Sequence, residues 1–442
     1  MIEHKLSRGD MVTLFVEETN IFANGVAKID GTVVFCEGAV AGDVVIALIT
    51  EVKKNYALAK ALKTVTSSPC RSEPRCPYFG KCGGCAFGNV TYEHEVFVKK
   101  STISAAFRRC GVKIPEINEF ISSKETGYRN KAVFHFDEEL DLGFFSKADR
   151  EICPVKNCAI LHPTVNIIMK KVEDILRERK DGLKGKLSYL FIRYFESSNE
   201  ASVVIGSPLG ADLSVVASRI ISEIPQVKTV MRGTGDDPAC DVFEKLEGND
   251  SVLSRAFGLE LEVAPASFFQ VNCEVGEKLF ERVGKLAAPK TGERFLDLYC
   301  GTGTIALSLA KREAEIGVVG IEISPEAVEN SKRNAERNGI ENTTFICADS
   351  EEFSRLLSRE HFDCITVDPP RAGLSEKTVR QILENAPNRL VYVSCDPSTL
   401  ARDVRLLSGL YEPSEVIGAD MFPGTSHVET CVLLVKTSAS ED

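Results

Sequence analysis

The 442-residue sequence lacks any apolar run that approaches the roughly 18 residues of a membrane-spanning helix. Its first residues also lack the basic-then-apolar plan of a secretory signal peptide. Without an export signal, the fifteen cysteines do not indicate a disulfide framework. Reduced thiols, metal ligands or a nucleophile are the interpretations that remain. These absences predict a cytoplasmic protein without a membrane partner.

An excess of basic charge is also absent. The 53 Lys and Arg residues face 64 Asp and Glu residues, which gives a net charge of -11 at pH 7. Taken alone, this balance argues against a nucleic-acid-binding protein. Residues 99–131 differ, because eight basic side chains there face only three acidic ones. This basic window is either a surface that contacts RNA or a solvated helix face.

The length predicts about three domains, and the 43% of hydrophobic residues is typical of globular proteins. Residues 1–65 hold short β-rich runs separated by turn signals such as Asn24-Gly25 and Asp30-Gly31. This pattern predicts a five-stranded barrel of the OB type, which often binds RNA, although a structural cap is the alternative. Residues 66–265 mix predicted strands and helices and are interpreted as a central α/β domain.

A loop rich in Pro and Gly holds four cysteines within 16 residues: Cys70, Cys76, Cys82 and Cys85. Gly83 and Gly84 let the backbone fold back, so that nearby sulfurs can converge on one centre. Thiolates select zinc or an iron–sulfur cluster, and Cys158 is a candidate ligand from farther along the chain. The spacing predicts a metal site without naming the metal, and free reduced thiols are the alternative.

Residues 266–442 alternate buried strands with helices, which predicts a parallel, doubly wound, Rossmann-like sheet. The strand 295–299 runs into a turn whose glycines, Gly301 and Gly303, permit close approach of a ligand. The next strand ends at Glu322, where a carboxylate can bind ribose hydroxyls, and a further strand ends near Asp349. No Lys-Ser or Lys-Thr pair follows the glycines, which excludes a P-loop. The pattern favours S-adenosylmethionine over a dinucleotide.

The next strand ends at the motif Asp368-Pro369-Pro370-Arg371, where the prolines turn the chain out of the sheet. A similar motif in amino-methyltransferases ends in an aromatic residue that clamps a planar base. Because Arg371 stands in that place, methylation of an exocyclic amine is disfavoured.

Cys395 follows the strand 389–393 and precedes Pro397, a favoured first residue of a helix. At such a helix terminus a partial positive charge stabilises a thiolate, although an isolated cysteine is more often a small buried residue. Glu429 lies in the motif 424–430 and is either a general base or a surface carboxylate. A carbon acceptor such as C5 of uracil explains both, because a thiolate activates the ring and a base removes the C5 proton.

Together these motifs resemble the RNA uracil-C5 methyltransferases that carry a TRAM domain and an iron–sulfur cluster, chiefly the branch that acts on 23S rRNA. The resemblance implies Cys395 as the nucleophile and Glu429 as the proton acceptor. It implies contacts with S-adenosylmethionine from six residues: Gln270, Tyr299, Thr304, Glu322, Asp349 and Asp368. It implies a [4Fe-4S] cluster, structural or RNA-binding in role, on four cysteines: Cys76, Cys82, Cys85 and Cys158.

Three hypotheses about function follow. The first is a monomeric enzyme that makes 5-methyluridine in 23S rRNA, from a base that leaves its stack in a looped or single-stranded segment. The second is the same chemistry on tRNA, against which stands the tendency of the bacterial tRNA enzymes to lack both barrel and cluster. The third is a non-catalytic, metal-bound RNA-binding or assembly protein. The predicted domains are 1–65, 66–265 and 266–442.

Overall fold

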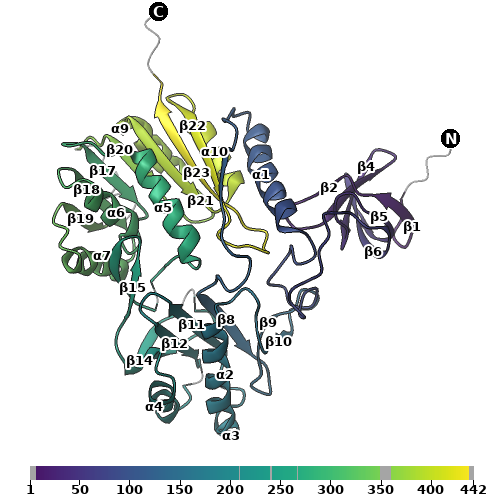
Figure 1. Ribbon diagram of the computed structural model, residues 1–442, viewed down its shortest axis with the longest axis horizontal. Helices are drawn as coiled ribbons and strands as arrows, with labels where there is room; N and C mark the ends of the chain where they lie inside the picture. Colours follow the sequence, from purple (N-terminus) through teal and green to yellow (C-terminus); the bar gives the residue numbers. More distant parts are fainter. Residues whose placement is uncertain (1–5, 209, 239–240, 266, 349–359, 438–442) are drawn as a thin grey trace, which may run out of the picture.

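The computed structural model describes residues 6–208, 210–238, 241–265, 267–348 and 360–437 (Figure 1). The chain begins with a six-stranded sheet of order β1-β5-β6-β4-β3-β2. Its strands are β1 Met11–Phe15, β2 Glu18–Thr19, β3 Gly25–Ile29, β4 Thr32–Glu37, β5 Val44–Val52 and β6 Tyr56–Thr66. The sequence predicts five strands here, and the sixth, β2, is only two residues long, too short to leave a periodic pattern.

A seven-stranded mixed sheet of order β10-β9-β8-β11-β12-β13-β14 follows in the middle of the chain. Its strands are β8 Lys131–Phe136, β9 Leu142–Phe145, β10 Ile152–Pro154, β11 Tyr189–Phe195, β12 Glu200–Gly206, β13 Val227–Gly233 and β14 Phe243–Gly248. The helices that accompany this sheet are α2 Pro163–Arg177, α3 Lys180–Leu183 and α4 Ser214–Glu223. The hairpin of β15 Val252–Ala256 and β16 Leu259–Val263 then leads to the last part of the chain.

The last part of the chain builds an eight-stranded sheet of order β19-β18-β17-β20-β21-β23-β22-β7. Its strands are β7 Glu119–Ile121, β17 Arg294–Leu298, β18 Gly317–Glu322, β19 Thr343–Cys347, β20 Cys364–Val367, β21 Arg389–Ser394, β22 Tyr411–Ala419 and β23 Glu429–Lys436. Neighbouring strands from β19 to β21 are parallel, whereas β23 is antiparallel to both β21 and β22. The predicted doubly wound methyltransferase sheet is confirmed.

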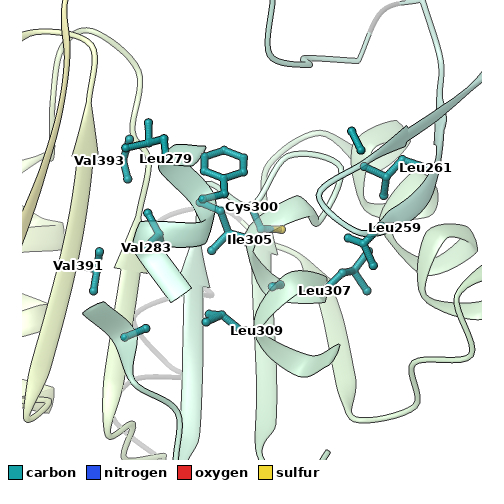
Figure 2. Close-up of a cluster of buried hydrophobic side chains, with 14 of the residues drawn as sticks. Leu259, Leu261, Leu279, Val283, Cys300, Ile305, Leu307, Leu309, Val391 and Val393 are labelled. Carbon is teal, nitrogen blue, oxygen red and sulfur yellow. The ribbon is translucent and has the colours of Figure 1, made fainter. Parts of the chain in front are cut away.

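Helices cover both faces of this sheet, and they are α1 Tyr92–Arg109, α5 Cys273–Ala287, α6 Thr304–Arg312, α7 Pro325–Arg337, α9 Glu376–Asn385 and α10 Pro397–Leu407. Successive side chains of a strand point to opposite faces, so β21 contributes to two separate cores. Val391 and Val393 pack against α5, where Val283 and Leu279 lie close to them (Figure 2). Leu390 and Tyr392 face the opposite side. A strand buried on both faces explains the nearly continuous apolar run 389–393.

Two elements from early in the chain join this sheet. The strand β7 pairs in parallel with β22, with Glu119 opposite Ile417, and α1 packs against α10 and β22. In Figure 1, α1 accordingly lies beside the yellow C-terminal strands rather than beside the central sheet.

The division into three domains at 65 and 265 stays a prediction. No helix within the described ranges is long and apolar enough to cross a membrane.

Candidate active site

The turn after β17 has an unusual backbone. Tyr299, Gly301 and Gly303 have φ angles of 62°, 56° and 82°, all in the left-handed region. Glycine adopts this region readily, but a residue such as tyrosine does so at a cost of about 1–3 kcal/mol and only where its surroundings hold it. A side chain at Gly303 would also meet the Phe345 ring at 2.9 Å. The turn therefore requires glycine, and it holds Tyr299 in a strained conformation of the kind that marks functional sites.

Two carboxylates from the strand ends stabilise this turn and the start of the helix that follows it. Glu322, at the end of β18, accepts a hydrogen bond from the Gly301 N–H at 3.1 Å. Asp297 accepts hydrogen bonds from the Thr366 hydroxyl at 2.6 Å and from the Ala306 N–H at 3.1 Å. Burial raises the pKa of Asp297 to about 7. Asp297 was not among the predicted site residues, and its place directly before the glycine turn is the signal that could have identified it.

One pocket opens at this turn, and four of the six predicted cofactor residues line it: Gln270, Tyr299, Thr304 and Asp368. Glu322 reaches the same turn through its bond to Gly301. Asp349 lies outside the described residues. The pocket wall also contains aromatic side chains that were not predicted, and Phe268 is 66% exposed beside it. An exposed aromatic ring next to a glycine turn and a strand-end carboxylate suits an adenosine-containing ligand.

Cys395 and Glu429 come from neighbouring antiparallel strands. Ser394 at the end of β21 pairs with Thr430 of β23, so that Cys395 follows one partner while Glu429 precedes the other. This register brings the two predicted catalytic residues to the same end of the sheet. Asp368 directly follows β20, whose Val367 pairs with Tyr392 of the adjacent parallel strand β21, so Asp368 and Cys395 lie at the same edge of the sheet on neighbouring strands. Asp368 also lines the pocket, which places the pocket at the edge of the sheet where Cys395 lies.

The helix terminus does not act on Cys395 as the sequence predicts. The Asp396 side chain caps α10 and accepts hydrogen bonds from the N–H groups of Ser398 at 2.8 Å and Thr399 at 3.2 Å. Burial, with the Glu429 carboxylate, raises the pKa of the Cys395 thiol to about 11, and only the Arg371 charge opposes this among its side-chain neighbours. The free protein therefore does not show the predicted lowering of the thiol pKa, because burial and the Glu429 carboxylate outweigh any stabilisation by the helix terminus.

Glu429 is a buried carboxyl group, only 9% exposed, at the first position of β23. Burial and the nearby Asp368 raise its pKa to about 8, whereas the Arg371 charge lowers it. The Nη2 atom of Arg371 lies 3.2 Å from both ring nitrogens of His427, in the loop before Glu429. The sequence analysis noted Arg371 only as a replacement of the aromatic residue in the amino-methyltransferase motif. Its positive charge acts on both catalytic candidates, Cys395 and Glu429.

The four predicted metal ligands line a single cavity of about 310 Å³: Cys76, Cys82, Cys85 and Cys158. None of the described cysteines forms a disulfide. Burial raises the pKa of the Cys82 and Cys158 thiols, and that of Cys85 to about 12, and neighbouring thiols of the set add to each shift. No group of three or more His, Cys, Asp or Glu residues within the described ranges is placed to hold one metal ion. The sequence thus identifies thiols that share a cavity but do not meet at one point.

Comparison with known proteins agrees with this geometry. The family described as tRNA (Uracil-5-)-methyltransferase matches residues 91–437, and the TRAM domain matches residues 5–62. An uncharacterized RNA methyltransferase of Halalkalibacterium halodurans is 32% identical, over 97% of this chain and 98% of that protein. Another from Clostridium acetobutylicum is 33% identical, over 95% of this chain and 96% of that protein.

Among solved structures, the tRNA (uracil-54, C5)-methyltransferase of Pyrococcus abyssi in complex with S-adenosyl-L-homocysteine is similar to this chain. The TM-score is 0.77 and the identity 27%, with 96% of this chain and 99% of that chain covered. The family match, the shared fold and the pocket at the glycine turn agree. The chain belongs to the tRNA (uracil-5-)-methyltransferase family, with an N-terminal TRAM domain, and is an S-adenosylmethionine-dependent RNA methyltransferase.

Proposed function

We propose that this enzyme methylates C5 of a uridine in RNA through a transient covalent bond between Cys395 and C6 of the base. The observation that carries the proposal is the pairing of Ser394 with Thr430, which sets Cys395 beside Glu429. Asp368 connects these residues to the pocket, because it lines the pocket and follows β20, the strand that pairs with β21. S-adenosylmethionine, when bound, supplies a methyl group on a positively charged sulfur.

The chemistry needs a residue that makes C5 electron-rich, because C5 of uracil is a weak nucleophile. The Cys395 thiolate adds to C6, and the electron pair of the C5–C6 double bond moves onto C5 and the adjacent carbonyl group. C5 takes the methyl group, and the Glu429 carboxylate then accepts the proton that C5 loses. The double bond re-forms as the bond between sulfur and C6 breaks, which returns Cys395 as a thiolate.

Arg371 is the residue suited to prepare both groups. The raised pKa values, about 11 for Cys395 and about 8 for Glu429, favour the protonated form of both side chains in the free enzyme, so both protons must pass to solvent before Cys395 adds to C6 and Glu429 accepts the C5 proton. The positive charge of Arg371 favours the deprotonated form of each. Its contact with His427 holds it beside the loop that precedes Glu429. We assign Arg371 the role of stabilising the thiolate once the base has entered.

A groove supports an extended single-stranded RNA as the substrate. It has a volume of about 480 Å³ and runs from Phe22 and Phe35 of the TRAM domain, past Lys147, to His427 in the loop before Glu429. Phe22 is 66% exposed, although it is a large apolar side chain. Bases stack on such rings with about 1–3 kcal/mol each, irrespective of sequence. The groove would lead flanking nucleotides from the barrel to the target uridine.

For the RNA class we propose 23S rRNA, on the resemblance carried by the strand-end motifs, with tRNA as the second candidate. The Pyrococcus abyssi tRNA enzyme favours the second candidate, since the match covers 96% of this chain and so includes most of the barrel. A barrel therefore does not distinguish the two substrates. Nucleoside mapping of rRNA and tRNA from strains with and without the gene separates them. Loss of 5-methyluridine from 23S rRNA supports the first candidate, and loss from tRNA alone overturns it.

We also propose that Cys76, Cys82, Cys85 and Cys158 hold a [4Fe-4S] cluster. The four thiols surround one cavity of about 310 Å³, while no three of the described candidate ligands meet at a point suited to one ion. A four-iron cluster takes four cysteine ligands around a group larger than a zinc ion, which fits this arrangement. The cluster, when bound, would crosslink the loop 76–85 to Cys158. Absorbance spectra and iron, sulfide and zinc analysis of anaerobically purified protein test it; one zinc per chain would contradict it.

A further inference from the structure

The loop that precedes Glu429 is a hairpin loop, residues 420–428, between β22 and β23. Its two ends are joined by the pair Ala419 and Glu429, so the proposed base closes the loop. His427, near the end of the loop, contacts Arg371. The strand register sets Glu429 beside Cys395, and the loop that ends at Glu429 carries His427 and bears on how the Glu429 side chain is oriented.

A buried lysine holds the beginning of this hairpin loop. Lys99 of α1 is 0% exposed, and its Nζ donates to Glu95 Oε1 at 2.6 Å, Asp420 Oδ1 at 2.8 Å and the Phe422 carbonyl at 3.2 Å. An ammonium group has three protons, and all three find acceptors here. Two of the acceptors belong to the hairpin loop, more than 300 positions away in the sequence. Lysine is rarely buried this completely unless it is paired.

The middle of the hairpin loop is held by further residues from the first 130 positions of the chain. The Gly424 N–H donates to Glu95 Oε1 at 2.7 Å. The Gly424 carbonyl accepts from the N–H groups of Ala86 and Phe87 at 2.9 and 3.0 Å, directly after Cys85 of the cysteine loop. The Tyr128 hydroxyl donates to the Pro423 carbonyl at 2.8 Å. The hairpin loop is thus attached to α1 and to the cysteine loop at once.

We propose that Lys99 is a positioning residue for methyl transfer, which fixes the hairpin loop so that Glu429 faces the covalent intermediate on Cys395. The proposal rests on the proposed function, because it concerns the step that Glu429 performs. A buried ion pair is a costly way to stabilise a fold, and apolar residues of similar size often serve as well. We therefore attribute the buried charge of Lys99 to the orientation of the hairpin loop rather than to the free energy of folding. Burial lowers the pKa of His427, and the positive charges of Arg371 and Lys99 lower it further.

The test separates formation of the covalent intermediate from its resolution. We expect Lys99→Met, with bound cofactor and an RNA oligonucleotide, to accumulate RNA–protein adduct on denaturing gels, as Glu429→Gln does. The rate of product release should fall about 10–100-fold, while the affinity for S-adenosylmethionine stays that of the wild type. A purely structural role would lower the amount of folded enzyme without changing the ratio of adduct to product.

Matched aspartate variants keep the test valid if Lys99→Met does not fold. Asp420→Asn removes one acceptor of Lys99. Asp43→Asn, in the TRAM domain, removes the equally buried carboxylate that pairs with Arg71. Both should lower stability, but only Asp420→Asn should raise the ratio of adduct to product. Equal ratios in the two variants would overturn the proposal. If Cys395→Ala kept its methyl-transfer activity, the covalent mechanism itself would fail, which distinguishes the two failures.

Discussion

The parallel half of the C-terminal sheet and its antiparallel end build their sites in different ways. The cofactor pocket lies at β17, β18 and β20, and its turn is held by Glu322 and Asp297 from the same or the adjacent strand. The catalytic residues lie at β21 and β23, where the hairpin loop depends on Lys99 and on the cysteine loop. The glycine turn of the pocket is held by carboxylates of its own and the adjacent strand, whereas the hairpin loop at the catalytic end is held by residues more than 300 positions away. Changes in the N-terminal segment should therefore affect catalysis more than cofactor binding.

The largest expected effect is on the nucleophile. Cys395→Ala removes the sulfur that activates the base, so methyl transfer should fall by more than about 1,000-fold. The affinity for S-adenosylmethionine, measured by calorimetry, should stay unchanged because the pocket does not need the thiol. Cys36→Ala serves as the control, because Cys36 lies in β4 of the N-terminal sheet and not at the active site. Residual activity near that of the wild type would refute the covalent mechanism.

The second effect concerns the base. Glu429→Gln keeps the shape of the side chain but cannot accept the C5 proton, so turnover should fall about 100–10,000-fold. The methylated base should remain attached to Cys395, and denaturing electrophoresis with labelled RNA measures this adduct. If the variant released product at the wild-type rate, another group would have to be the base.

A change in the parallel half of the sheet should weaken cofactor binding and leave the resolution of the covalent adduct unchanged. Glu322→Gln removes the charge that holds the Gly301 N–H, and loss of such a charged hydrogen bond costs about 1.5–3 kcal/mol. The dissociation constant of S-adenosylmethionine should rise roughly 10–100-fold. The ratio of adduct to product should not change at saturating cofactor. Glu326→Gln, on the first turn of α7, is the control, and an altered ratio in Glu322→Gln would break the distinction between the two halves.

The last expected effect is on the pH dependence of stability and not on activity. The pKa of Glu429 is raised to about 8 by burial, so the folded protein keeps a proton that the unfolded chain releases above about pH 4.5. This group's contribution to the free energy of unfolding therefore falls as the pH rises from about 4.5 to 8. Glu429→Gln should gain stability over the wild type as the pH rises from about 5.5 to 8, by up to about 1.4 kcal/mol per pH unit. Urea unfolding measures this, with exposed Glu341→Gln as the control, and a constant difference would contradict it.

Much of the fold could be predicted, because its signals are local. Buried runs, the turn glycines and the prolines after Asp368 and Cys395 mark strand ends within a few residues. Two features had no such signal. The strand β7 is three residues long and belongs to the sheet only through its pairing with β22. The pKa of Cys395 depends on burial and on carboxylates from other strands, and the helix terminus that was expected to lower it is capped by Asp396.

The sequence by itself determined the class of sheet, the glycine turn and the candidate residues, because each is written in adjacent positions whose conformations are governed by sterics and burial. Only the tertiary structure decided that Cys395 and Glu429 are neighbours, since this follows from the register of β21 against β23. It alone joined Lys99 to Asp420, because a buried charge finds its partner through packing and not through sequence distance.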